Sequence, residues 1–263
     1  MDQRPIGVFD SGLGGLTAVR QLRRIMPAEN IIYFGDSARV PYGNRSRETL
    51  LKYARQDTRF LRSFDLKAVV IACGTVSTNC LEDLQRENDI PIVGVVEPAV
   101  RAAADATRNR RVGLVATRAS VASGAFTKSL QRIAPDVQLL AQACPLFVPM
   151  VEEGRFRPGD TVIETIAREY LQPLLEQDVD TLILGCTHYP LLWDVISGVM
   201  GPRVTLIDSG AESARAVRDL LTAGDGLAQR ETGSARYYTS DRAADFQRLD
   251  HDAQQIDISR YSV

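Results

Sequence analysis

Two segments of the chain end a short apolar run with a cysteine that polar groups follow. Residues 182–184 run into Gly185, Cys186, Thr187 and His188, and residues 68–72 run into Cys73. Apolar runs of this length are typical of buried parallel strands. Ligand sites of open parallel sheets lie at the carboxyl ends of their strands. Both cysteines are therefore candidates for chemistry.

Two thiols in one site suit the inversion of a stereocentre at an acidic carbon. Such a reaction needs a base on one face of the carbon and an acid on the other. A thiolate and a thiol can exchange these roles with each turnover, but a free cysteine has a pKa of roughly 8.5, so the site must favour the thiolate. Asp10 and His188 are candidates to assist proton transfer, and one of them is expected beside each cysteine.

Other chemistries fit the same residues less well. The loop Asp10-Ser11-Gly12-x-Gly14-Gly15 follows a strand but lacks the spacing of a dinucleotide-binding loop, and a tight turn explains its glycines equally well. Cys186-x-His188 with a distant Cys73 is not a closed zinc ligand set. A thiol-protease nucleophile needs one cysteine and leaves the second unexplained. Cys80 and Cys144 are expected to be buried small apolar residues.

The composition is that of an ordinary globular protein. The 263 residues are 44% hydrophobic and 24% charged, with a formal net charge of −2. This charge gives no broad cationic surface for nucleic acid or membrane. The first residues have no apolar signal core, so we expect a cytoplasmic protein with reduced thiols. The candidate motifs contain no lysine for pyridoxal phosphate, and we expect neither a cofactor nor a metal.

Hydrophobic periodicity predicts alternating strands and helices. The first part is expected to contain strands 6–9, 31–34, 68–72 and 92–96, helices 16–25, 47–64 and 77–87, and a joint at Glu97-Pro98. The second part is expected to contain strands 112–116, 137–141, 182–186 and 204–207, helices 119–133, 161–176 and 209–222, and a loop at 145–154. A strand at 235–239 and a helix after Asp241 follow.

The two parts share a plan that indicates a weak internal duplication. The separation along the sequence between the start of the first strand and the cysteine is similar in both parts, from Ile6 to Cys73 and from Val112 to Cys186. Two helices begin with capping-box spacing, Thr161-x-x-Glu164 and Ser209-x-x-Glu212.

In their order along the chain, these motifs make the sequence resemble the glutamate racemases of the aspartate/glutamate racemase superfamily. The resemblance covers nearly the whole chain and rests on Asp10-Ser11-Gly12-Leu13-Gly14-Gly15, Asp36 with Pro41-Tyr42-Gly43, Ala72-Cys73-x-Thr75, Glu97-Pro98, Pro145-Leu146-Phe147-Val148-Pro149 with Glu152, and Gly185-Cys186-Thr187-His188-Tyr189-Pro190-Leu191-Leu192.

The resemblance implies two similar parallel-sheet α/β domains facing across a cleft, the second inserted in the first, with residues 1–97 and 208–263 in one and 98–207 in the other. It implies a cofactor-independent racemase that interconverts L- and D-glutamate and supplies D-glutamate for peptidoglycan. The implied catalytic residues are Cys73, Cys186, Asp10, Glu152 and His188. The implied substrate-binding residues are Asp10, Ser11, Pro41, Tyr42, Gly43, Gly74, Thr75, Thr187 and His188.

The resemblance also implies a small-molecule substrate and a homodimer, with no need for nucleic acid or membrane. Two alternatives are a racemase for aspartate or another amino acid, and a non-catalytic binding protein on the same fold. The family usually has asparagine after the first cysteine, where this chain has Gly74. We expect Thr75, Ser11 or an ordered water to replace the missing amide.

Overall fold

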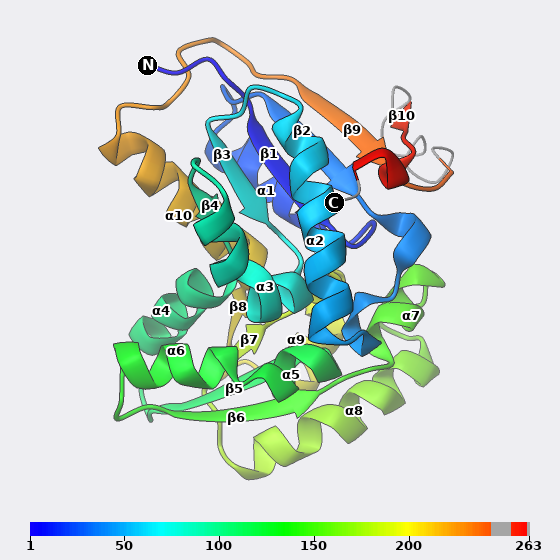
Figure 1. Cartoon of the computed structure of the whole chain (residues 1–263). Helices are drawn as coiled ribbons and strands as arrows, with labels where there is room; N and C mark the ends of the chain where they lie inside the picture. Colours follow the sequence, from blue (N-terminus) through cyan, green and yellow to red (C-terminus); the bar gives the residue numbers. More distant parts are fainter. Residues whose placement is uncertain (243–253, 262–263) are drawn as a thin grey trace.

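The computed structural model describes residues 1–242 and 254–261 and contains two parallel β-sheets with helices packed around them (Figure 1). The larger sheet has the strand order β10-β9-β2-β1-β3-β4, and every described pairing in it is parallel. Its strands are β1 (Ile6–Asp10), β2 (Ile31–Gly35), β3 (Ala68–Ile71), β4 (Ile92–Val93), β9 (Ala235–Thr239) and β10 (Gln254–Gln255).

The smaller sheet has the order β6-β5-β7-β8 and is also parallel. Its strands are β5 (Arg111–Ala116), β6 (Gln138–Ala143), β7 (Thr181–Leu184) and β8 (Thr205–Asp208). They come from one stretch of chain, whereas the larger sheet takes strands from both sides of that stretch. The predicted class, α/β with two parallel sheets, is confirmed.

Helices connect the strands and bury the sheet faces. They are α1 (Leu16–Ile25), α2 (Arg47–Arg62), α3 (Gly74–Glu87), α4 (Val96–Ala106), α5 (Arg118–Ser123), α6 (Ala125–Ile133), α7 (Phe147–Glu152), α8 (Thr161–Glu176), α9 (Trp193–Met200) and α10 (Ser209–Ala223), with 3₁₀ turns η1 (Ser37–Arg39), η2 (Tyr42–Asn44), η3 (Tyr189–Leu192) and η4 (Ile258–Tyr261). Figure 1 shows α4 and α6 beside each other on the smaller sheet, with α8 on another side of it. In the described part of the chain, no helix is long and apolar enough to span a membrane.

Two segments that connect strands of the smaller sheet differ from the sequence prediction. The helix expected at 119–133 is two helices, because Gly124 between α5 and α6 has φ +66°, a left-handed conformation that ends a helix. The loop expected at 145–154 contains the short helix α7.

Some predicted ends are also wrong. Helix α3 begins at Gly74 instead of residue 77, and β4 stops at Val93 because α4 begins at Val96. Glu97 and Pro98 therefore lie in the first turn of α4, where proline is well tolerated, and not in a joint.

Helices α8 and α10 are each capped by the residue that precedes the predicted capping residue, Thr161 or Ser209. Asp160 caps α8 by accepting a hydrogen bond from the Val162 N–H, and Asp208 caps α10 by accepting from the Gly210 N–H. Both replace the predicted threonine and serine because a carboxylate in front of a helix accepts these bonds equally well. The helix predicted after Asp241 lies outside the described residues.

Candidate active site

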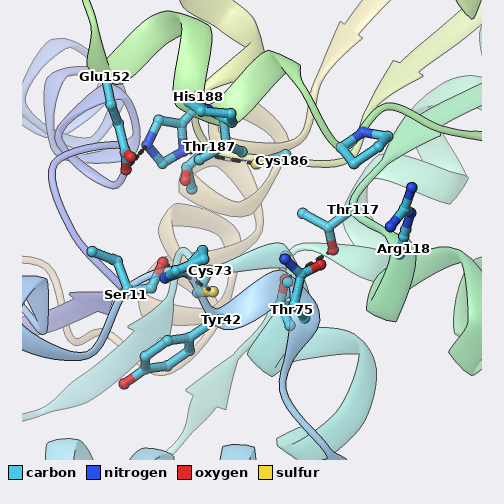
Figure 2. A pocket seen from close by; sticks show the side chains of 18 residues that line it. Ser11, Tyr42, Cys73, Thr75, Thr117, Arg118, Glu152, Cys186, Thr187 and His188 are labelled. Carbon is cyan, nitrogen blue, oxygen red and sulfur yellow. Dashed lines mark hydrogen bonds and ion pairs between the residues drawn. The ribbon is translucent and has the colours of Figure 1, made fainter.

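The loops at the carboxyl ends of both sheets surround one cavity of about 270 Å³, shown in Figure 2. The loops follow β1, β2 and β3 of the larger sheet and β5, β6 and β7 of the smaller one. The lining residues are Ser11, Val40, Pro41, Tyr42, Gly43, Asn44, Cys73, Gly74, Thr75, Thr117, Arg118, Pro145, Val148, Pro149, Glu152, Cys186, Thr187 and His188. A cavity of this size suits a metabolite and not a larger ligand.

Cys73 lies directly in front of α3 and is almost fully buried. Its Sγ is 3.8 Å from Ser11 Oγ. Burial, and next the negative charge of Asp10, raise the pKa of the Cys73 thiol well above its ordinary value. Cys73 is therefore a neutral thiol at neutral pH.

Cys186 has a different partner. Its Sγ is 3.8 Å from Nδ1 of His188, and Nε2 of the same ring is 3.3 Å from Oε1 of Glu152. Burial works against the charged imidazole, but the contacts with Cys186 and Glu152 outweigh it and raise the pKa of His188 to about 10. His188 is therefore an imidazolium at neutral pH, placed between the sulfur of Cys186 and the carboxylate of Glu152.

Figure 2 shows Cys186, His188 and Glu152 along one side of the cavity and Cys73 with Ser11 along the opposite side. A small molecule between them would meet one sulfur on each side. The environments differ in charge, because one sulfur faces a cation and the other has a carboxylate behind it. This arrangement can remove a proton from one face of a carbon and return one to the other.

Replacing Glu152 by glutamine is expected to lower the pKa of His188, because an amide keeps the size of the carboxylate and loses its charge. Opposite charges at this range shift a pKa by about one unit or more, so the alkaline limb of the kcat/KM profile should move to lower pH by about that amount. The measurement is the pH profile of both enzymes. Glu153→Gln is the control, since Glu153 is exposed and outside the cavity wall. An unmoved limb in Glu152→Gln would contradict the role of the ion pair.

Asp10 is fully buried and lies behind the cavity instead of in its wall. Its carboxylate accepts hydrogen bonds from the N–H groups of Gly12 and Gly15, and Thr187 Oγ1 is 3.3 Å from it. Burial raises the pKa of Asp10, although the positive charge of His188 and the two N–H groups act against that. The glycine loop therefore wraps a carboxylate, and these N–H groups are not free to hold a phosphate.

Residues 40–44 form one wall of the cavity. Tyr42 is buried, and Figure 2 shows its hydroxyl pointing away from the two cysteines. The hydroxyl contacts Asp36 and Asp57. Any contact of Tyr42 with a ligand would therefore come from its backbone or ring. Pro41, which follows a cis peptide bond, and Gly43 complete the wall.

Gly74 brings the two cysteine segments together. A Cβ on Gly74 would lie 2.2 Å from the carbonyl oxygen of Gly185, which is backbone and cannot rotate away. The first turn of α3 therefore packs directly against the segment that carries Cys186. The next residue, Thr75, places its hydroxyl 3.0 Å from the hydroxyl of Thr117.

Several wall residues were not identified from the sequence. Thr117 follows β5 and Arg118 begins α5, so the rule that sites lie at strand ends could have found both. Val40 and Asn44 flank the identified motif Pro41-Tyr42-Gly43, and Pro145, Val148 and Pro149 lie inside another identified motif, but none of the five was named as a site residue. In the described part of the chain, no cluster of three or more His, Cys, Asp or Glu side chains could hold a metal.

Comparisons with known proteins agree with this geometry. The family model for Asp/Glu/hydantoin racemase matches residues 12–217. A glutamate racemase of Geobacter metallireducens is 46% identical over 250 residues, which are 95% of this chain and 92% of that protein.

Solved structures of two glutamate racemases superpose on nearly the whole chain. The enzyme of Bacillus anthracis has a TM-score of 0.93 at 34% identity and covers 98% of both chains. The enzyme of Francisella tularensis, solved in complex with D-glutamate, has a TM-score of 0.89 at 34% identity and covers 99% of this chain and 100% of that one. The chain belongs to the Asp/Glu/hydantoin racemase family and, within it, to the glutamate racemases.

Proposed function

We propose that the cavity racemises glutamate by proton exchange between Cys73 and Cys186. The observation that carries the proposal is the position of the two sulfurs on opposite sides of one cavity (Figure 2). A base and an acid that face each other across the α-carbon are what inversion of its configuration requires.

In one direction of the proposed reaction, Cys186 acts as the base, next to the positive charge of His188, and Cys73 acts as the acid. The Cys186 thiolate takes the α-proton from one face, and the electron pair of the broken C–H bond remains on the substrate. The Cys73 thiol then donates its proton to the opposite face. The product has the inverted configuration and the two cysteines have exchanged protonation states, so the reverse reaction uses them in the opposite roles.

The other wall residues are proposed to orient the substrate. Hydroxyls of Ser11, Thr75 and Thr187 and the backbone of the Tyr42–Gly43 segment offer hydrogen bonds to carboxylate and ammonium groups. Glu152 holds His188 in its charged form, and Asp10 acts from behind through its contact with Thr187. Gly74 has no side-chain amide that could bind the substrate, so these hydroxyls are proposed to bind the substrate carboxylate on that side of the cavity.

Incubation of the purified protein with L-glutamate, after exhaustive dialysis against EDTA, should give the racemate with no added cofactor. In deuterated water, deuterium should appear at the α-carbon of D-glutamate while the remaining L-glutamate is at first unlabelled, because each thiol serves one face. Circular dichroism follows the loss of ellipticity as the racemate forms, and mass spectrometry follows the label. Early label in L-glutamate, or activity that returns only with metal or pyridoxal phosphate, would contradict the two-thiol scheme.

The same assay with L-aspartate and other amino acids tests the substrate, and faster turnover of aspartate would exclude glutamate as the natural substrate.

As a glutamate racemase the protein would supply D-glutamate for peptidoglycan in the cytoplasm, and we propose that it acts as a homodimer. We also propose an inserted second domain, residues 98–207, because every residue of the smaller sheet's strands lies in this range except Asp208, the last residue of β8.

A further inference from the structure

A buried polar cluster lies directly behind the cavity wall. It consists of Asp36 after β2, Arg39 in η1, Tyr42 in η2 and Asp57 on α2. The two aspartate side chains are fully buried and Arg39 is 16% exposed. Tyr42 belongs to both the cluster and the wall, so the hydrogen bonds of the cluster hold a residue that lines the cavity.

Arg39 connects the two carboxyl groups. Its Nε is 2.5 Å from Asp36 Oδ2 and one terminal nitrogen is 2.7 Å from Asp57 Oδ1, while the guanidinium lies 4.2 Å from the ring centre of Tyr53. One guanidinium cannot neutralise two carboxylates. If both were ionised, an uncompensated negative charge would be buried, which is costly.

The hydrogen bonds of Tyr42 identify where a proton must be. Its hydroxyl oxygen contacts Asp36 Oδ2 closely and lies 3.2 Å from Asp57 Oδ2. A phenol has one proton to donate, so it can donate to only one of the two carboxyl groups. Both contacts are hydrogen bonds only if the other carboxyl group donates to the phenol oxygen.

Asp36 is occupied as an acceptor on both oxygens. Its Oδ2 faces the Nε–H of Arg39 and the Tyr42 hydroxyl, and its Oδ1 accepts a 2.7 Å hydrogen bond from Ser240 Oγ. Asp57 accepts from Arg39 on Oδ1, while its Oδ2 faces the phenol oxygen. Asp57 is therefore the group with room for a proton.

We propose that Asp57 is protonated in the folded protein and donates to Tyr42, which donates to Asp36, and that this chain positions the Tyr42–Gly43 wall of the cavity. The charged and titratable groups that act on Asp57 are Asp36, Arg39 and Tyr42. Burial, and next the charge of Asp36, raise the pKa of Asp57 well above its usual range, against the opposing effect of Arg39. The pKa of Tyr42 is also raised, mainly by burial, so its phenol stays protonated.

The wall has little freedom to move. A Cβ on Gly43 would lie 2.9 Å from Cβ of Thr117, so the backbone of Gly43 already packs against the opposite sheet's loop. A shift of Tyr42 would move Gly43 against Thr117 or away from the ligand. Asp57 and Asp36 are therefore positioning residues that act on substrate binding through Tyr42.

Replacing aspartate by asparagine is expected to have different effects on KM at positions 57 and 36. In Asp57→Asn the amide can donate to Tyr42 from the place of Oδ2 and accept from Arg39 through its oxygen, so we expect KM for glutamate within about twofold of the wild type. In Asp36→Asn the negative charge that accepts from Arg39 and Tyr42 is lost, and the N–H₂ group must turn toward Ser240, whose hydroxyl then has to accept instead of donate; weakening this buried charged contact should raise KM by about tenfold or more. The reverse pattern, with Asp36→Asn tolerated and Asp57→Asn impaired, would overturn the proposal.

A second measurement detects the proton itself. A group whose pKa is raised in the folded state contributes stability below its unfolded pKa, about 3.9 for aspartate, and loses that contribution as pH rises through the folded pKa. The amide of Asp57→Asn does not titrate, so its Tm relative to the wild type should rise as pH increases from about 4. A difference in Tm that falls with pH, or does not change, would show that Asp57 is ionised and would overturn the proposal.

The two measurements separate the two claims. The kinetic comparison rests on the proposed racemisation of glutamate, whereas thermal unfolding needs no substrate. A protein that does not racemise glutamate but shows the expected pH-dependent difference in Tm would leave the buried proton in place and reject only the proposed function.

Discussion

Replacing either Cys73 or Cys186 by serine is expected to lower the rate of glutamate racemisation by about 10²–10⁴-fold, the usual contribution of one general acid or base. A serine hydroxyl has nearly the size of a thiol but is a far weaker base at neutral pH. Each reaction direction uses both residues, so both variants should lose L-to-D and D-to-L turnover. Initial rates by circular dichroism in the two directions are the measurement.

Cys80→Ser is the matched control for this experiment. Cys80 is also buried and lies on α3, the helix that Cys73 precedes, but it belongs to the apolar core and not to the cavity wall. The same exchange of sulfur for oxygen there should leave the rate near that of the wild type, with some loss of Tm. If Cys73→Ser or Cys186→Ser kept more than about a tenth of the wild-type rate, against the expectation for an essential acid or base, the two-thiol mechanism would be wrong.

Gly74→Asn is expected to lower kcat/KM by about tenfold to a hundredfold, even though asparagine is the residue usual in the family that this sequence resembles. The Cβ of any new side chain would lie 2.2 Å from the carbonyl oxygen of Gly185, so the backbone before Cys186 must move. A displacement of about 1 Å at a reacting group can cost about 10²-fold in rate. The restored amide cannot compensate while Cys186 is displaced.

Gly198→Ala separates this effect from the general effect of removing a glycine. Gly198 lies inside α9, and a Cβ there would meet nothing within 4 Å. Its replacement should keep full activity and raise stability by about 0.5–1 kcal/mol. Steady-state kinetics and thermal unfolding test both variants. If Gly74→Asn instead lowered KM for glutamate by tenfold or more, the close packing at Gly74 would be unimportant and glutamate a doubtful natural substrate.

Local patterns determined much of the fold. Uniformly apolar runs such as 68–72 and 182–184 indicate strands that are buried on both faces. Segments with helical periodicity lie between the strands, and a helical crossover between two strands of one sheet is typical of parallel strands. The same patterns place Cys73 and Cys186 after β3 and β7, where the structure has them. Such features depend on residues close together in sequence, which is why the sequence alone is enough for them.

Predictions failed where several local choices are similar in energy. Residues 119–133 have helical periodicity throughout, and only the left-handed φ of Gly124 divides them. Thr161 and Ser209 are good helix caps, but Asp160 and Asp208 precede them and take that position. A serine, threonine or aspartate side chain can cap a helix at a similar free energy, so packing of the first turn decides between neighbours.

The sequence by itself determined two strand-end cysteines in a parallel α/β protein and the motifs of a racemase family. Only the tertiary structure decided that the two sulfurs face each other, that Glu152 reaches His188, that Asp10 lies behind the cavity, and that Thr117 and Arg118 belong to its wall. It also decided that Asp36 and Asp57 share one arginine. These contacts join residues far apart in the chain, and their charges depend on burial, which no local spacing encodes.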